Sequence, residues 1–146
     1  MQFHNDLVIN RPAREVFRYL ADLENLPRWN YAIAETRKIS PGPPAHGSTY
    51  LQTRTLPRPM QETLEISRYE PDRLLAVTGG FGDLEGTSTY TLESNGETTR
   101  LTNEIELVGR GLLRAFSALA TATVKRAVAE NLTVLKHLLE NTAGTP

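Results

Sequence analysis

Arg54 and Glu62 are the two residues of this chain whose types and spacing most directly suggest chemistry. They lie in two alternating stretches, from Gly47 to Thr55 and from Met60 to Tyr69, on either side of a proline-rich turn. If the stretches form a hairpin, the arginine faces the carboxylate across it. An inward-facing pair of this kind can orient or protonate a polar group of a bound molecule. The alternative is an ion pair at the rim of the sheet, in contact with water, and the sequence leaves both interpretations open.

The alternation of these stretches places the pair on the core face of the predicted hairpin. With the turn centred near Arg58, Gln52 faces Leu64 and Tyr50 faces Ile66. Neighbouring positions on a strand point to opposite faces, so the threonines of both stretches turn to solvent. Arg54, Gln52 and Glu62 are therefore expected to point inward, among apolar side chains.

Two further sets of polar side chains are candidates for contact with a ligand. Tyr50 and Tyr90 are expected to face inward, where a hydroxyl can donate to a ligand carbonyl. Asn103 lies between apolar residues on the core face of the last strand, and Asn131 lies near the apolar face of the last helix. A buried amide needs hydrogen-bond partners. Ligand contacts are one interpretation; ordinary core tyrosines, and amides satisfied by each other or by the backbone, are the other.

Familiar catalytic, metal and nucleotide motifs do not occur in the sequence. The three histidines are far apart and fit no metal-ligand spacing, and there is no cysteine. The glycine-rich run from Gly79 to Gly82 is not followed by a helical pattern, so it does not predict a phosphate-binding loop. No metal ion and no cofactor is expected. Glu62, Arg54 and Tyr50 remain the candidates for catalysis.

Composition limits the broad class of the protein. The chain has 146 residues and a net charge of −1, with both signs mixed along it. One domain with a substantial core is expected, and neither nucleic acid nor an anionic membrane is indicated as a partner. The N-terminus lacks a signal-like run, and no apolar stretch is long enough to span a bilayer. A cytoplasmic protein without integral membrane association, monomeric or weakly dimeric, is expected.

The last part of the chain organises the elements that position these residues. The apolar spacing of residues 112–140 predicts one long helix. Its apolar stripe at the helical period is bulky in the second half and small in the first, where Ala120 and Val124 lie. Small residues facing a sheet indicate either close packing or a ligand cavity under the first half, with Phe116 near its mouth. The stripe comprises Leu113, Phe116, Ala120, Val124, Val128, Leu132, Leu135 and Leu139.

Everything before this helix predicts short elements, mostly strands. A strand over 3–9 is followed by two short helical segments that reach Trp29, then by strands over 32–39, 47–55, 60–69, 74–78, 86–93 and 98–108. Asn95-Gly96 is expected to form the turn of the last hairpin, because Asn-Gly is a strong hairpin signal. Trp29 and Phe81 are expected in loops at a cavity entrance, or as simple packing residues. The order predicts an α+β fold in which a curved sheet wraps the last helix.

In their order and spacing, several stretches resemble one known superfamily. Ile9 to Phe17, with Leu20-Ala21-Asp22 and Trp29, is similar to the opening of the START-like, or SRPBCC, superfamily, and most closely to its polyketide cyclase/dehydrase-like branch. Gly47 heading a strand, Tyr69-Glu70-Pro71, Thr99-Arg100-Leu101-Thr102 and the long last helix follow the same pattern. The resemblance implies one domain over 1–146, with 141–146 expected as a disordered tail. It implies a helix-grip fold, in which a seven-stranded antiparallel sheet surrounds the C-terminal helix and a cavity for small hydrophobic molecules lies between them.

Three functions follow from these observations. The favoured hypothesis is a carrier or sensor that binds a small lipid-like or polyketide-like molecule, because no inward histidine or carboxylate pair stands out. The second is a cofactor-independent polyketide cyclase or dehydratase that uses an acid or base in the cavity. The third is an interaction module with a filled core. The residues expected to contact a ligand are Trp29, Tyr50, Arg54, Glu62, Leu64, Phe81, Tyr90, Asn103, Phe116, Ala120, Val124 and Asn131.

Overall fold

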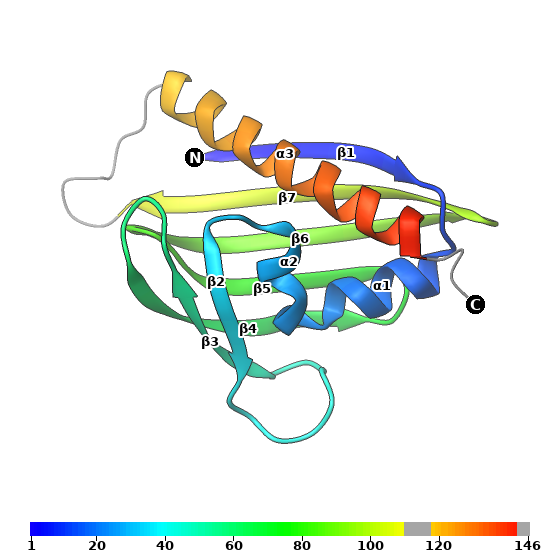
Figure 1. Cartoon of the computed structure of the whole chain (residues 1–146), viewed down its shortest axis with the longest axis horizontal. Helices are drawn as coiled ribbons and strands as arrows, with labels where there is room; N and C mark the ends of the chain where they lie inside the picture. The colour runs from blue at the N-terminus through cyan, green and yellow to red at the C-terminus, as the bar shows by residue number, and fades with distance from the viewer. Residues whose placement is uncertain (110–117, 143–146) are drawn as a thin grey trace.

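One curved antiparallel sheet and one long helix form the two layers of the molecule (Figure 1). The computed structural model describes residues 1–109 and 118–142. The seven strands lie in the order β1-β7-β6-β5-β4-β3-β2, and α3 crosses the concave face of the sheet. The elements are β1 Gln2–Ile9, α1 Ala13–Ala21, a 3-10 turn Leu23–Asn25, α2 Leu26–Trp29, β2 Ile33–Lys38, β3 Thr49–Arg54, β4 Met60–Glu70, β5 Leu74–Phe81, β6 Leu84–Asn95, β7 Thr98–Gly109 and α3 Ala118–Thr142.

The long C-terminal helix is anchored by its second half. Leu132, Leu135 and Leu139 are buried in the main apolar core, whereas most residues from Ala118 to Arg126 are exposed or half-buried. The predicted start at 112 lies outside the described residues, and the described helix begins at Ala118. It continues to Thr142, two residues beyond the predicted end of the helix, and residues 143–146 of the expected tail lie outside the described residues.

The C-terminal end of α3 is tied to the connection between β1 and α1. The guanidinium of Arg11 donates to the carbonyl oxygens of Leu139 and Glu140, and the backbone N–H of Asn10 donates to the Glu140 carboxylate at 2.8 Å. A helix leaves its last carbonyl groups without intrahelical partners, and a cation near them also interacts favourably with the helix dipole. These contacts hold the last turn of α3 against the connection between β1 and α1.

Both predicted hairpins form, with the correct faces but a register displaced by two residues. In β3 and β4, Gln52 rather than Arg54 lies opposite Glu62, and Tyr50 lies opposite Leu64. A displacement by two preserves the alternation of side chains, so the prediction that Arg54, Gln52 and Glu62 point inward is confirmed. Their burial contradicts the alternative of a water-exposed ion pair at the sheet rim.

The last hairpin shows the same displacement, and its turn explains why. Asn95 pairs with Thr98, so Gly96 and Glu97 form the two-residue turn, rather than Asn95 and Gly96. Gly96 has φ +72°, as a two-residue turn with glycine in its first position requires. The new register places Tyr90 opposite Asn103.

Two glycines of the run from Gly79 to Gly82 belong to the sheet, because β5 continues past the predicted end at 78 to Phe81, and Gly82 lies in the turn that follows. Gly79 and Gly80 lie in β5, and Gly79 pairs with Gly86 of β6. A Cβ atom at Gly79 would lie 2.2 Å from the Thr63 carbonyl oxygen, and one at Gly86 would lie 1.8 Å from the Glu106 carbonyl oxygen. Glycine at both positions therefore permits a close approach of neighbouring strands that any side chain would prevent. The sheet is strongly curved in this region (Figure 1).

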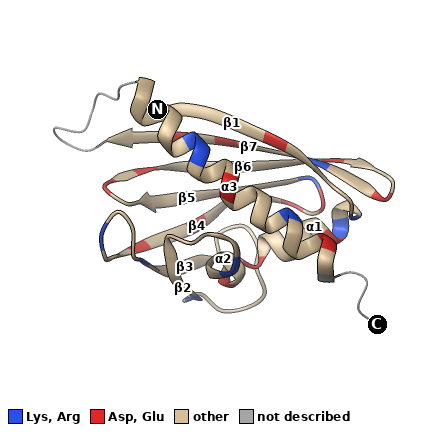
Figure 2. Ribbon diagram, turned by 45° about the horizontal axis from the view of Figure 1, so that its top comes forward, with Lys and Arg blue, Asp and Glu red and all other residues tan. Residues whose placement is uncertain are grey.

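Charged residues of both signs are interspersed over the helices and strands (Figure 2). The described part of the chain contains no helix that is long and apolar enough to cross a membrane. The observed arrangement, with a seven-stranded antiparallel sheet, a long C-terminal helix and short helices after β1, is the α+β helix-grip fold that the sequence predicts.

Candidate ligand-binding cavity

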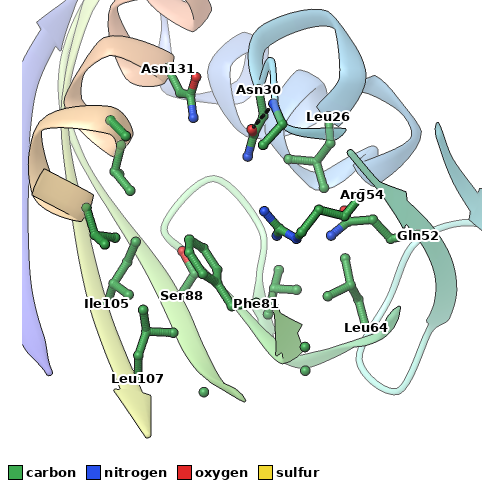
Figure 3. Close-up of a pocket in the computed structure, with 18 of the residues that line it drawn as sticks. Leu26, Asn30, Gln52, Arg54, Leu64, Phe81, Ser88, Ile105, Leu107 and Asn131 are labelled. Atoms are coloured by element: carbon green, nitrogen blue, oxygen red, sulfur yellow. Dashed lines mark hydrogen bonds between the residues drawn. The ribbon is translucent and has the colours of Figure 1, made fainter. Parts of the chain in front are cut away.

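A cavity of about 320 Å³ lies between the sheet and the less buried half of α3 (Figure 3). This volume lies within the range of small-molecule sites. The lining residues come from both layers and from the segment around α2: Leu20, Leu23, Leu26, Trp29, Asn30, Tyr31, Ala32, Gln52, Arg54, Leu56, Pro57, Leu64, Val77, Gly79, Gly80, Phe81, Gly86, Thr87, Ser88, Tyr90, Asn103, Ile105, Leu107, Thr123, Val124, Ala127, Val128 and Asn131.

The walls of the cavity are mainly apolar. Ile105 and Leu107 of β7 and Val124 and Ala127 of α3 are among the apolar residues that line it. Val124, which the sequence places in the first half of the helix, lines the cavity and also packs against the cluster of Phe3, Ile105 and Leu107. An apolar molecule that enters this space loses contact with water, which is the main favourable contribution to binding in such sites.

Arg54 is the one charged side chain among the described residues that line the cavity, and it forms a buried ion pair with Glu62. Its Nε donates to Glu62 Oε1 at 2.9 Å, and the two side chains are only 6% and 3% exposed. The same carboxylate accepts a hydrogen bond from Gln52 Nε2 at 2.9 Å and another from the backbone N–H of Gly82. Both oxygens of the Glu62 carboxylate are thus engaged by protein donors.

The outer edge of the Arg54 guanidinium faces the cavity (Figure 3). Its Nη1 donates to the Leu56 carbonyl oxygen at 3.3 Å, and Nη2 has no hydrogen-bond partner among the described residues. The Phe81 ring lies 4.9 Å from the guanidinium carbon, which is within cation–π distance. The cavity therefore offers oriented N–H donors beside an aromatic ring, as a ligand oxygen requires.

A second polar group lies on the sheet side of the cavity. Asn103 Nδ2 donates to the Ser88 hydroxyl at 2.8 Å and to the Thr89 carbonyl oxygen at 3.2 Å, and Tyr90 lies opposite Asn103 on the neighbouring strand. Burial raises the pKa of Tyr90, and the neighbouring Ser88 hydroxyl offsets part of that increase. The Tyr90 phenol therefore remains protonated at neutral pH and can donate a hydrogen bond.

Asn131 lies on α3, opposite this group. It is buried and lines the cavity, and it has no hydrogen-bond partner among the described residues. Asn103 bonds within the sheet, partly to the backbone, so of the two alternatives to a ligand contact it follows backbone satisfaction and does not pair with Asn131. Figure 3 shows the Asn131 amide pointing into the cavity, toward Asn30 of the α2 segment. Its polar atoms are available to a bound molecule.

Tyr50 does not lie in the cavity, although the sequence made it a candidate for catalysis and binding. It is fully buried in the main core, and its hydroxyl oxygen has no hydrogen-bond partner in the described structure. Burial, together with the nearby carboxylates of Asp22 and Glu24, raises the pKa of Tyr50 to about 12. The inward face of β3 passes from the core at Tyr50 to the cavity at Gln52 and Arg54, and alternation alone cannot separate the two regions.

Replacing Tyr50 with phenylalanine is expected to stabilise the protein slightly, and more so in alkali. The substitution removes a buried hydroxyl without a partner, so at neutral pH the expected change is from zero to about 1 kcal/mol in favour of folding. Because the folded-state pKa is raised, the unfolded chain releases this proton first as pH rises from 10 to 12. The free energy of unfolding of the wild-type protein is therefore unaffected by this group below pH 10. At about pH 11 it is lower by about 1 kcal/mol, a loss that the phenylalanine variant does not share. Urea denaturation of the wild-type protein and the variant, at neutral pH and at about pH 11, measures the difference in their free energies of unfolding. A phenylalanine variant that is less stable than the wild type at both pH values would contradict the prediction.

Most of the predicted contact residues that the structure describes line the cavity, and three of them do not. Trp29, Arg54, Leu64, Phe81, Tyr90, Asn103, Val124 and Asn131 lie on its surface. Tyr50, Glu62 and Ala120 are not among its lining residues, and Phe116 lies outside the described residues. The carboxylate of Glu62 is covered by Arg54 and Gln52, so its effect on a ligand is electrostatic.

The contribution of the short helical segments was missed. Leu20, Leu23, Leu26, Asn30 and Tyr31 close one side of the cavity. Their apolar spacing predicted helices that pack on the sheet, and the leucines do belong to or adjoin the core. Nothing in the spacing distinguishes a leucine that meets another side chain from one that meets a space. Within the described residues, no group of three or more His, Cys, Asp or Glu side chains is arranged to hold a metal ion.

Comparison with protein families finds one matching model over nearly the whole chain. The family is described as polyketide cyclase / dehydrase and lipid transport, and the match covers residues 2–140. Comparison with curated protein sequences finds no significant match.

Solved structures with the same fold share little sequence with this chain. A conserved protein from Geobacillus kaustophilus has a TM-score of 0.79 at 13% identity, with 97% of each chain covered. The Zhui aromatase/cyclase from Streptomyces sp. R1128 has a TM-score of 0.74 at 12% identity, covering 98% of this chain and 95% of that one. Ara h 8.0201 has a TM-score of 0.74 at 14% identity, covering 95% and 97%. At these identities the likeness shows a common fold.

Proposed function

Because this chain belongs to the polyketide cyclase / dehydrase and lipid transport family, we propose that it binds one small hydrophobic molecule between the sheet and α3 and acts as a carrier or sensor. The observation that carries the proposal is the cavity of about 320 Å³, walled mainly by apolar side chains and containing a few oriented polar groups. The ligand is lipid-like or polyketide-like, with an apolar body for the walls and a polar group for Arg54. The protein performs this role as a monomer or weak homodimer.

The polar groups of the cavity favour binding over acid–base catalysis. A general base must reach the proton that it removes, with a pKa near the working pH. Glu62 is engaged by three donors and lies outside the cavity lining, and burial raises the pKa of Tyr90 away from neutrality. No histidine or other carboxylate is among the described residues of the lining.

A second candidate function is that of a cyclase or dehydratase on a polyketide-like substrate. One observation favours it: Tyr90, Ser88 and Asn103 form a polar group on the cavity wall that can hold a substrate oxygen. Cyclisation can depend largely on the conformation that a shaped cavity imposes on its substrate. Under this alternative, Tyr90 donates a hydrogen bond to a carbonyl whose negative charge increases during ring closure.

The proposal predicts saturable binding of a neutral apolar dye to the purified protein. N-phenylnaphthylamine has an apolar aromatic body suited to the cavity walls, and its fluorescence rises on transfer out of water. A titration should saturate at one dye per chain, with a dissociation constant of about 10 μM or below. Fluorescence that rises linearly with dye, or that is equal for the urea-unfolded chain, would contradict the proposal.

A further inference from the structure

The position of Glu62 behind the cavity wall determines the charge that the cavity presents. Arg54 lines the cavity, whereas Glu62 does not, and their side chains meet at 2.9 Å. Within the described residues of the lining, no other side chain carries a charge. The two opposite charges cancel at this end of the cavity, so the site has donors without a net positive charge.

Both oxygens of the Glu62 carboxylate are bonded to protein donors, and the carboxylate is buried behind the cavity lining, so it acts on a ligand through its charge and not through hydrogen bonds. Oε1 accepts from Arg54 Nε and Gln52 Nε2, each at 2.9 Å, and Oε2 accepts from the backbone N–H of Gly82. These contacts fix the carboxylate close behind the guanidinium. Its remaining influence on a bound molecule is repulsion of negative charge.

Arg54 keeps its donors for the ligand while its charge is compensated. Nη1 has one protein acceptor, the Leu56 carbonyl oxygen at 3.3 Å, and Nη2 has none among the described residues. The Phe81 ring covers one face of the guanidinium at 4.9 Å, and Figure 3 shows the outer edge directed into the space between Phe81 and α2. An oxygen of the ligand placed there accepts one or two N–H hydrogen bonds.

We infer that Glu62 is a specificity-determining residue: it makes the cavity select an uncharged oxygen acceptor, such as a ketone, ester or amide carbonyl, over a carboxylate or other anion. The inference rests on the proposed binding function and specifies the ligand class of the same site. An anion that enters the cavity loses its hydration, and only an uncompensated cation would offset that loss. Beside an arginine that is already neutralised, the anion meets attraction and repulsion together. A neutral carbonyl avoids both the larger desolvation cost and the repulsion.

Two aromatic probes of nearly equal shape test this inference. Methyl naphthyl ketone carries a neutral carbonyl, and naphthoate carries a carboxylate in the same place. Each displaces N-phenylnaphthylamine from the wild-type protein at about pH 8 and fixed ionic strength, where the carboxylate is ionised. The ketone should bind at least about tenfold more tightly than naphthoate. Equal affinity, or tighter binding of naphthoate, would overturn the inference while leaving the binding function intact.

Glu62→Gln then identifies the cause of the selectivity. Glutamine retains one oxygen acceptor for Arg54 and Gln52 and removes the charge, at the cost of the hydrogen bond from the Gly82 N–H, which lies outside the cavity wall. Naphthoate affinity should therefore rise at least about tenfold while ketone affinity changes less than about threefold. Asp83→Asn is the matched control. Asp83 lies in the turn between β5 and β6, where its exposed carboxylate pairs with Arg58, and it does not line the cavity. It should leave the ratio of affinities unchanged.

The outcomes separate the two proposals. If dye does not bind the wild-type protein at all, the binding function fails, and the inference fails with it. If dye binds and Glu62→Gln changes both probes by the same factor, or Asp83→Asn changes the ratio equally, the role of Glu62 is overturned alone. The wild-type comparison of the two probes does not depend on whether any variant folds.

Discussion

Replacing Ala127 with phenylalanine is expected to reduce affinity for N-phenylnaphthylamine by about 100-fold while the protein stays folded. Ala127 lines the cavity from α3, between Val124 and Val128, and faces the sheet across the space. A phenyl ring there occupies the volume that the dye needs. Because the ring fills empty space instead of displacing packed atoms, the overpacking cost of a dense core should be largely absent. Fluorescence titration gives the affinity, and thermal unfolding checks the fold.

Ala122→Phe is the matched control for this variant. Ala122 lies on the same helix but is exposed, and it is not among the cavity-lining residues. The same substitution there should change dye affinity less than about twofold. Equal loss in both variants would indicate a general effect on α3, and full dye binding by Ala127→Phe would place the dye elsewhere on the protein.

Replacing Glu62 with leucine is expected to destabilise the protein by about 3 kcal/mol, because it leaves the buried Arg54 charge without its partner. Gln52 and the backbone N–H of Gly82 lose their acceptor in the same change. The double variant Arg54→Met/Glu62→Leu replaces both ions with apolar side chains and should recover most of the loss. Urea denaturation of the single and double variants measures the coupling between the two residues.

An exposed ion pair supplies the comparison. Arg58 and Asp83 also pair, but their side chains are 61% and 39% exposed, and Asp83→Leu should cost no more than about 0.5 kcal/mol. A double variant as unstable as Glu62→Leu would mean that the carboxylate acts through Gly82 and the adjacent turn. A single variant within about 0.5 kcal/mol of wild type would mean that water reaches the guanidinium and compensates its charge.

Side-chain alternation predicted faces correctly, while turn geometry determined register. The inward position of Arg54, Gln52 and Glu62 depends only on parity, and a displacement by two residues preserves parity. The partners themselves depend on which residues form the turn, and at the last hairpin these are Gly96 and Glu97. Assigning the turn to Asn95-Gly96 therefore predicted the correct faces and the wrong pairs.

The cavity was predictable in position but not in outline. The change from small to bulky residues along the last helix indicated where the layers separate, and Val124 and Asn131 line the space as expected. Whether an inward residue meets the core or the cavity depends on how far it lies along the sheet, which sequence alternation does not encode. Tyr50 and Arg54 illustrate this limit, because they share one face of β3 and have different surroundings.

The curved sheet was expected, but the role of its glycines was the least predictable feature. Gly79 and Gly86 form a cross-strand pair that allows adjacent backbones to approach closely, and both line the cavity. In the sequence, the first belongs to a glycine run that is typical of a loop. Only the pairing of β5 with β6 shows that these glycines provide space beneath α3.

The most direct test of the central claim is a crystal structure with a brominated methyl naphthyl ketone. The bromine scatters anomalously, so its position is found independently of the protein model. The account predicts a bromine peak between α3 and the sheet, bounded by Val124, Ala127 and Ile105, with the ketone oxygen within about 3 Å of an Arg54 nitrogen. A bromine peak only on the outer surface, with side chains filling the space beneath α3, would contradict it.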